Sequence, residues 1–231
     1  IKSSLTTSAG LSTGCVWEPP SGCGVVALLL KHVIPAENLH VHLYEKGRLT
    51  RMKLGIVTTH PIQYQVPLIR EIDSRDGIRV EVYYGHLPEA EQQGKGFGSS
   101  FEWDLPLLEG YSWRVVQERD GQETNENVPT CGWSAAYTEV DAMLIHGWQS
   151  WFMRRALLRG VWSDVPLLVR GDSNSMKPRS WYVRLLHRLY LQPFAKYLYV
   201  GESNRQFYRG AGVSSEDLCF SPRCVENGRF D

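Results

Sequence analysis

The sequence has no long hydrophobic run and no net charge, and each absence argues against certain classes of protein. The longest apolar run extends only from Val25 to Leu30, which is far too short to span a bilayer. This run also lacks the basic flank and small-residue cleavage site of a signal peptide. The 25 basic and 25 acidic side chains cancel, so the charge balance gives no indication of binding to nucleic acid or to an anionic membrane. These absences predict a cytoplasmic protein, with any membrane association limited to a peripheral contact at the inner face.

Cysteine is scarce and irregularly spaced, and several catalytic motifs are missing. The five cysteines are odd in number, which favours free thiols in a reducing cytoplasm over a disulfide framework. Four residues separate Cys219 from Cys224, and no Cys-x2-Cys or His-x3-His pair accompanies them to complete a zinc site. A Gly-x-Ser-x-Gly motif, a Walker loop and acidic pairs at metal-binding spacing are also absent. We therefore expect no metal and no cofactor in this chain.

Residues 1–51 differ in composition from the rest of the chain. Ser, Thr and Gly dominate up to Gly24, and the first residue is Ile. We interpret 1–51 as an atypical N-terminal segment, either upstream sequence or poorly structured, that is joined to a domain beginning at Met52.

One motif in this segment leaves a second function open. Gly22 to Ala27 fits the Gly-x-Gly-x-x-Ala turn of dinucleotide-binding folds, and Glu45 follows about twenty positions later, as that fingerprint expects. The preceding stretch, Val16 to Pro20, is a poor first strand, and the motif needs a strand before it. A nucleotide-dependent oxidoreductase that uses Gly22–Ala27 is therefore the weaker alternative.

From Met52 onward, short apolar runs alternate with helical patterns. Apolar residues at helical spacing predict helices at 66–72, 153–161 and 182–189, and a further helix ends near Gly210. Polar loops at 87–100 and 118–134 flank a short extended pair, 101–104 and 111–116. The expected strands are Leu54–Val57, Ile78–Tyr84, Ala142–Ile145, Pro166–Val169, Tyr197–Val200 and Leu218–Phe220. This alternation predicts an α/β fold, Rossmann-like, with a mostly parallel doubly wound sheet and helices on both faces.

Polar or glycine-containing residues follow five of the expected strands. Because the carboxyl ends of parallel strands share one edge of the sheet, we expect these residues to converge on a common crevice, where ligands of open α/β sheets bind. They are His60 with Gln63 and Tyr64 behind it, Gly85-His86, His146-Gly147-Trp148, Arg170-Gly171-Asp172 and Gly201-Glu202.

A purely structural role stays open for each of these residues. His60 precedes a proline and could only satisfy a turn, and His146 could be a buried, hydrogen-bonded histidine. Arg170 and Asp172 could simply pair with each other, although two charges at the end of a buried strand are costly unless they are used. Glu202 could do no more than start a helix.

Five segments carry a resemblance to a known family: Lys53 to Tyr64, Asp141 to Trp148, Pro166 to Ser173, Tyr199 to Asn204 and Cys224 to Asp231. Through them, residues 52–231 resemble the N-terminal, acceptor-side domain of family 4 glycosyltransferases of the GT-B fold. This family is common in cell-wall and exopolysaccharide synthesis. The last segment is similar to the one that leads from this domain into the donor domain.

The resemblance implies hexosyl transfer from a nucleotide-sugar donor to a hydroxyl of a glycan, a lipid-linked acceptor or a small molecule, with retention at the anomeric carbon. The Arg170–Asp172 turn matches the place where several relatives carry a catalytically important His, so Arg170 or Asp172 is the nearest catalytic candidate. A positive group there would stabilise charge on the departing phosphate, which favours Arg170. The implied acceptor-binding residues are His60, Gln63, Tyr64, His86, His146, Gly147, Trp148 and Glu202.

The resemblance also implies a missing partner. The family binds its nucleotide sugar in a second Rossmann-like domain, which we expect just after Asp231, so we expect this chain alone to be inactive. A non-catalytic, Rossmann-like glycan-binding module is the other alternative. Trp151, Phe152, Arg154 and Arg155 offer an aromatic and basic contact to a membrane, although packing against the sheet explains the aromatic side chains equally well.

Overall fold

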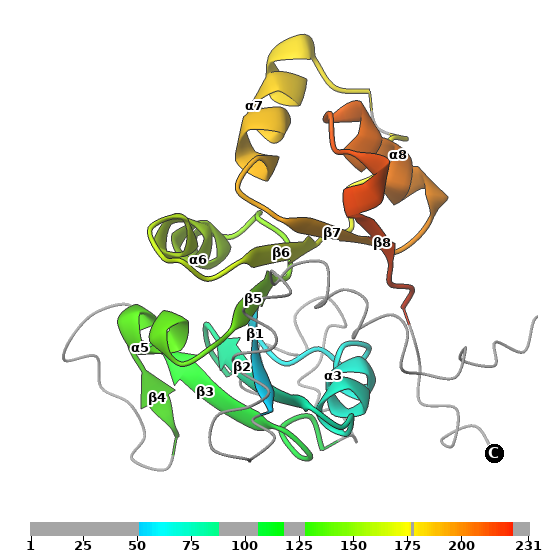
Figure 1. The fold of residues 1–231 in the computed structure, drawn as a ribbon. Coiled ribbons are helices and arrows are strands. Elements are labelled where there is room, and N and C mark those ends of the chain that lie inside the picture. The colour runs from blue at the N-terminus through cyan, green and yellow to red at the C-terminus, as the bar shows by residue number, and fades with distance from the viewer. Residues whose placement is uncertain (1–50, 88–105, 118–127, 177, 224–231) are drawn as a thin grey trace, which may run out of the picture.

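The computed structural model of the chain describes residues 51–87, 106–117, 128–176 and 178–223, and Figure 1 shows its ribbon. Four of the sequence predictions lie wholly or almost wholly outside these residues. They are the 1–51 segment with its Gly22–Ala27 motif, the loop 87–100, the extended segment 101–104 and the Cys224–Asp231 segment.

The described residues form one sheet in which all neighbouring strands are parallel. Its eight strands are arranged in the order β4-β3-β2-β1-β5-β6-β7-β8. The predicted Rossmann-like α/β fold is thereby confirmed. The strands are β1 (Met52–Thr58), β2 (Ile78–Tyr84), β3 (Ser112–Val116), β4 (Thr130–Cys131), β5 (Ala142–Ile145), β6 (Leu167–Arg170), β7 (Lys196–Tyr199) and β8 (Leu218–Phe220).

The direction of winding reverses at β1. The chain first builds outward from β1 through β2, β3 and β4, and then returns to place β5 on the other side of β1. From β5 it builds outward in the opposite direction, through β6, β7 and β8. The neighbouring pair β1 and β5 is therefore the topological switch point, where open parallel sheets form their ligand crevice.

Helices cover the two faces of the sheet, as predicted (Figure 1). Within the described ranges, none of them is long and apolar enough to cross a membrane. The helices are α3 (Val66–Asp73), α5 (Trp133–Thr138), α6 (Trp151–Val161), α7 (Trp181–Leu191) and α8 (Glu202–Gly210), and a 3-10 turn, η1, spans Ser215–Asp217.

Two hydrophobic clusters hold the layers together, because successive strand residues point to opposite faces. On one face, Ile69 of α3 packs in the same cluster as Ile56 of β1 and Val82 of β2. On the other face, the inward sides of α5, α6 and α8 pack against Ile145 of β5 and Val169 of β6. The sheet is thus buried on both sides near the switch point.

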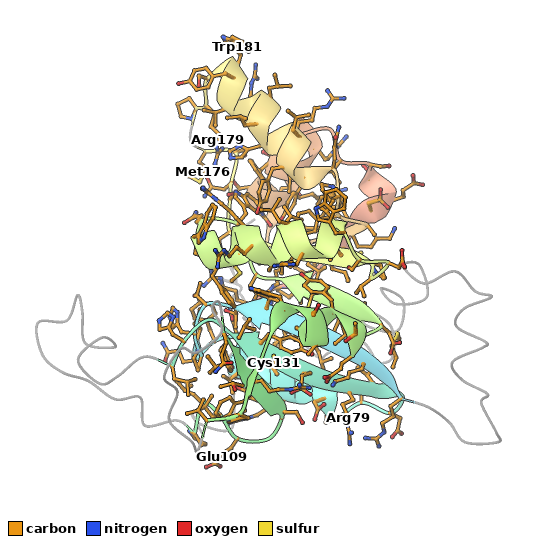
Figure 2. The ribbon with its side chains drawn as sticks, turned by 90° about the vertical axis from the view of Figure 1, so that its left-hand side faces the viewer. Arg79, Glu109, Cys131, Met176, Arg179 and Trp181 are labelled. Carbon is orange, nitrogen blue, oxygen red and sulfur yellow. The ribbon has the colours of Figure 1, made fainter. Side chains whose placement is uncertain are left out.

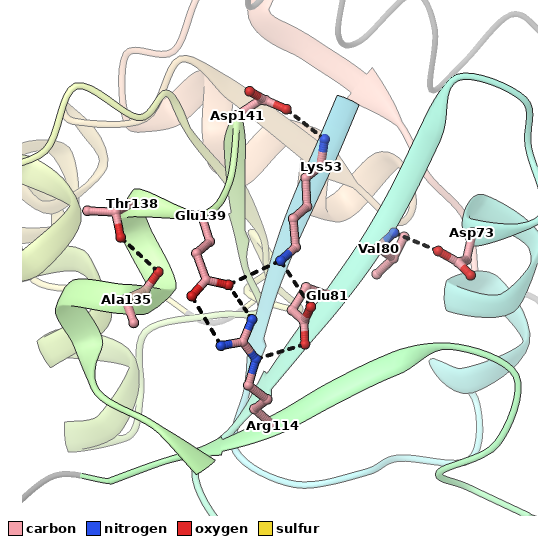
Figure 3. A network of polar contacts seen from close by, with 9 residues as sticks. All are labelled: Lys53, Asp73, Val80, Glu81, Arg114, Ala135, Thr138, Glu139 and Asp141. Atoms are coloured by element: carbon pink, nitrogen blue, oxygen red, sulfur yellow. Dashed lines mark hydrogen bonds and ion pairs between the residues drawn. The ribbon is translucent and has the colours of Figure 1, made fainter. Parts of the chain in front are cut away.

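A network of acidic and basic side chains links β1 to strands β2 and β3 (Figure 3). Lys53 Nζ lies 3.1 Å from Glu81 Oε2 and 3.3 Å from Glu139 Oε2. Arg114 Nε lies 3.1 Å from the other Glu81 oxygen, and its guanidinium also binds Glu139. The Arg114 contact holds the pKa of the Glu139 carboxyl below its usual range. The nearly buried Glu81 carboxylate is tolerated because two cations contact it.

The predicted loop 118–134 was wrong at its C-terminal end. Strand β4 begins at Thr130, and α5 extends from Trp133 to Thr138. Both elements are too short for a periodic pattern to stand out. They form because Trp133, Ala136 and Tyr137 are buried against the sheet and α6, which is a tertiary effect.

Candidate functional site

A cavity of about 330 Å³ lies at the carboxyl ends of β1, β5 and β6. It therefore occupies the topological switch point, where α3 leaves β1 toward one face of the sheet and α6 leaves β5 toward the other. The lining residues come from the end of β1 and the turn after it (Thr58, Thr59, Ile62, Tyr64, Gln65), from the β5–α6 segment (His146, Gly147, Trp148, Gln149, Ser150, Met153), from the end of β6 (Arg170, Gly171, Asp172, Ser173), and from Arg223.

The turn after β5 is fixed by its backbone. His146 N donates to Val57 O over 3.0 Å, so the turn stays attached to β1. Gly147 then adopts φ of 88°, a left-handed conformation that favours glycine. At Gly171, a Cβ atom would lie only 2.9 Å from the Trp148 ring. The close neighbour that requires a glycine there is thus an aromatic side chain of the same site.

His146 has an unusual environment. Both ring nitrogens are buried, and within the described part of the chain neither has a hydrogen-bond partner. Burial, and secondarily the nearby Arg170 charge, lower the pKa of His146 to about 3. The imidazole is therefore neutral near pH 7, and it can donate one hydrogen bond and accept another if a ligand or water reaches it. An unsatisfied polar group in a native interior is costly, so each one needs an explanation such as a bound ligand or water.

Arg170 brings a positive charge into the cavity wall. Its side chain is nearly buried, and its Nη2 donates to the backbone oxygens of Ser221 and Pro222 over 3.2 and 3.1 Å. These bonds fasten the end of β6 to the segment that follows β8. They leave a cation in the cavity wall that favours polar or anionic ligand groups.

A second arginine reaches the cavity from the described C-terminal end. Arg223 Nη2 lies 2.6 Å from Asp172 Oδ2, and its guanidinium stacks 4.4 Å from the centroid of the Tyr64 ring. This cluster joins the turn after β1 to the turn after β6. The Asp172 contact raises the pKa of Arg223, so the arginine stays charged.

The N-terminus of α6 adds a further positive potential. Ser150 caps this 11-residue helix by accepting a hydrogen bond from Met153 N over 3.2 Å, and the first turn holds no acidic residue. Backbone N–H groups at a helix N-terminus attract negative or electron-rich groups. Together with both arginines, this end of α6 suits a ligand rich in hydroxyl or anionic oxygens.

Six of the ten predicted site residues line the cavity, and four do not. The lining residues are Tyr64, His146, Gly147, Trp148, Arg170 and Asp172, and the four outside the lining are His60, Gln63, His86 and Glu202. Trp148 is mostly buried and stacks on Phe207 at a centroid distance of 5.9 Å, so its ring also serves the core.

Three of the four residues outside the lining form contacts with other side chains. His60 and His86 lie side by side, with ring centroids 5.5 Å apart, and Thr59 Oγ1 lies 2.9 Å from His60 Nδ1. Burial lowers the pKa of both histidines, and His86 adds to the effect on His60. Glu202 lies in the first turn of α8, 3.4 Å from Arg205. A part in acceptor binding stays a prediction for these four residues, as it does for the six that line the cavity.

Sequence reasoning missed several polar lining residues, such as Thr58, Gln65 and Arg223. Thr58 Oγ1 donates to Gln65 Oε1 over 3.3 Å. Both residues adjoin the predicted His60–Tyr64 loop, so their positions gave a signal. Arg223 gave none, because it follows the last strand and reaches the cavity only through the fold. In the described ranges, no three His, Cys, Asp or Glu side chains are grouped closely enough to hold a metal ion.

Comparison with known proteins finds a likeness at the level of structure. No family model matches the chain, and no curated protein matches it. Among solved structures, it is similar to Anabaena HepE in complex with UDP and glucose, with a TM-score of 0.44 and 11% sequence identity. The match covers 77% of this chain and 46% of HepE, so the chain spans about half the length of that neighbour. A likeness this distant does not transfer the ligands of one protein to another.

Proposed function

We propose that this chain is the acceptor-binding domain of a retaining, nucleotide-sugar-dependent glycosyltransferase, and that the cavity at the β1–β5 switch point holds the acceptor. One observation carries the proposal. The segments that resemble family 4 glycosyltransferases, around His60–Tyr64, His146–Trp148 and Arg170–Ser173, supply most of the lining of one cavity. The cavity lies at the position where parallel sheets bind ligands.

The chemistry of the lining suits a sugar acceptor. Hydroxyl and amide groups of Thr59, Gln65 and Ser150 can exchange hydrogen bonds with sugar hydroxyls, and the neutral His146 can do the same. The Tyr64 ring carries the Arg223 guanidinium on one face, and its other face can stack on a sugar. The acceptor oxygen would form a bond to the anomeric carbon while the bond from that carbon to the donor phosphate oxygen breaks, and the hydroxyl proton would pass to the departing phosphate.

Within this proposal, Arg170 is the group that stabilises negative charge on the departing phosphate. Its buried position next to the cavity supports that role, whereas Asp172 is engaged with Arg223 at 2.6 Å. The nucleotide sugar itself would bind to a second domain. We therefore propose that the 231-residue chain binds acceptor but does not transfer sugar alone.

Saturation-transfer NMR on the purified chain tests the proposal with a panel of glycans and glycosides. Ser173 is half-buried in the lining, so Ser173→Trp should fill the cavity and abolish saturation transfer to the acceptor that binds. Ser112→Trp is the matched control, because Ser112 is exposed at the start of β3, at the opposite edge of the sheet. If no sugar binds, or if Ser173→Trp binds as well as the control, the cavity is not an acceptor site.

A further inference from the structure

Helix α7 presents a second apolar face to solvent. At helical spacing, Trp181, Tyr182, Leu185, Leu186 and Leu189 occupy a continuous arc of about 140°. All five are exposed, from 48% for Leu185 to 72% for Trp181. Soluble proteins rarely leave so many large apolar side chains in one exposed patch without a use.

The opposite side of α7 already serves the fold. His187 and Tyr190 pack against Trp148, with ring centroids 6.2 and 6.1 Å apart, and Leu191 is buried in the core. The outward arc is therefore not needed to attach the helix. A helix that is apolar on both sides has its second side covered by something else.

The neighbouring helix α6 also exposes large apolar and aromatic side chains. Its inward side is buried, while Trp151, Leu158 and Trp162 are exposed, with Trp162 88% exposed at the C-terminal end. The Arg155 guanidinium lies 5.7 Å from the centroid of the Trp151 ring. Figure 2 faces the flank on which α6 and α7 lie, with Trp181 at the outer end of α7 and Arg79 far away, at the lower edge of the molecule.

The charge on the two helices has a single sign. Together α6 and α7 hold five arginines and no acidic residue, and the exposed Asp164 follows three residues after α6. Arg184 and Arg188 lie on α7 directly beside the apolar arc, and Arg154 and Arg159 are exposed on α6. The chain therefore has a basic flank although its net charge is zero.

We propose that the outward faces of α6 and α7 bind the surface of an anionic lipid bilayer. Apolar side chains would enter the headgroup boundary while the arginines pair with lipid phosphates, as in interfacial amphipathic helices. Trp and Tyr at the helix ends suit that boundary, because their rings are apolar and carry one polar group. A second copy of this chain fits less well, since a two-fold contact would bring Arg184 and Arg188 against like charges.

This proposal corrects one part of the predicted membrane contact. Phe152 is buried inward and belongs to the core, whereas Trp151, Arg154 and Arg155 remain on the outward side. The main contact moves to α7, whose apolar residues predicted a helix but point away from the sheet. The membrane proposal does not depend on the proposed sugar transfer.

Vesicle flotation tests it with the whole purified chain. We expect binding to vesicles of phosphatidylcholine mixed with phosphatidylglycerol, weakening as salt is raised, and little binding to phosphatidylcholine alone. Arg184→Glu with Arg188→Glu should weaken binding at least about tenfold, because each basic residue near such a surface raises the binding constant by a factor of roughly five. Leu185→Gln with Leu186→Gln and Leu189→Gln should weaken it about tenfold through lost apolar burial.

The matched control is Arg51→Glu with Arg79→Glu, which reverses two exposed charges at the amino ends of β1 and β2. It should bind anionic vesicles like the original chain, and circular dichroism shows whether each variant folds. Failure of the original chain to float with anionic vesicles would overturn the proposal. So would equal loss in the control, unchanged binding in both α7 variants, or self-association through α7 without any vesicle binding.

Discussion

His146 is the side chain of the site whose hydrogen bonding and pKa depart most from the ordinary. Its ring nitrogens are buried without a hydrogen-bond partner in the described part of the chain, and its pKa falls to about 3. A group in that condition is a poor proton donor near neutral pH, but it is ready to bond with a polar ligand. Within the proposed function, His146 therefore suits acceptor binding and not acid catalysis.

The same burial makes stability depend on pH. The pKa of His146 is lower in the folded state than in the unfolded state, where it is near 6.5. As pH falls below that value, the unfolded state takes up a proton that the folded state refuses, so folding stability decreases. Between about pH 7.5 and pH 5 this single residue should remove roughly 2 kcal/mol.

Urea unfolding of the original chain and of His146→Leu at both pH values measures this effect. The variant should lose about 2 kcal/mol less on acidification, while the other histidines contribute equally to both proteins. An identical loss in the two proteins would contradict the buried, neutral state of His146.

At the scale of single elements, the sequence predicted those whose burial follows from local pattern. The runs Leu54–Val57 and Ala142–Ile145 read as buried strands because parallel strands in a sheet covered on both faces are continuously apolar. Helix α5 escaped prediction, although Trp133, Ala136 and Tyr137 have the i, i+3, i+4 spacing of a buried face. Six residues are too few to separate that spacing from chance.

Helix α7 shows a different limit of pattern reading. Its apolar spacing correctly predicted a helix, but the residues that gave the signal face outward. Periodicity reveals that a face exists, and only the packed fold reveals which face meets the sheet.

The charged network around β1 gives a test of how the strands are held together. Arg114→Met removes one of the two cations that contact the nearly buried Glu81 and also breaks the contact with Glu139. We expect a loss of about 2 kcal/mol in the free energy of unfolding, because the mostly buried Glu81 carboxylate loses one of the two cations that offset its desolvation.

Arg75→Met is the matched control for that network. Arg75, two residues past the end of α3, pairs at the surface with Glu71 of that helix, so its loss should cost less than about 0.5 kcal/mol. Urea unfolding of both variants measures the difference. Equal losses would show that the Arg114 network contributes no more than a surface pair.

At the scale of the whole molecule, the cavity depends on topology more than on any one motif. The sequence placed His146, Arg170 and Tyr64 at strand ends, and right-handed parallel winding brings those ends to one edge. The sequence could not predict that Arg223 lines the site. Arg223 lies about fifty residues beyond Arg170 in the chain and reaches the cavity only because β8 pairs with β7 at the end of the sheet. Nor could composition reveal the basic flank, because charges of the two signs cancel over the full length.

The two proposals also meet at this scale. Helix α6 starts just after Ser150, which lines the cavity, and α7 packs through His187 and Tyr190 on Trp148, another lining residue. Both helices of the basic flank therefore adjoin the cavity wall. If both proposals hold, the acceptor site lies beside the bilayer surface, where a lipid-linked acceptor would be presented.

The most direct measurement of the central claim is the location of a bound acceptor on the chain labelled with ¹⁵N-glycine. Addition of the sugar that binds should shift the amide resonances of Gly147 and Gly171, which line the cavity. Those of Gly77 and Gly110, which precede β2 and β3 at the opposite edge, should stay in place. Shifts confined to Gly77 and Gly110, or no shift with any acceptor sugar, would contradict an acceptor site at the β1–β5 switch point.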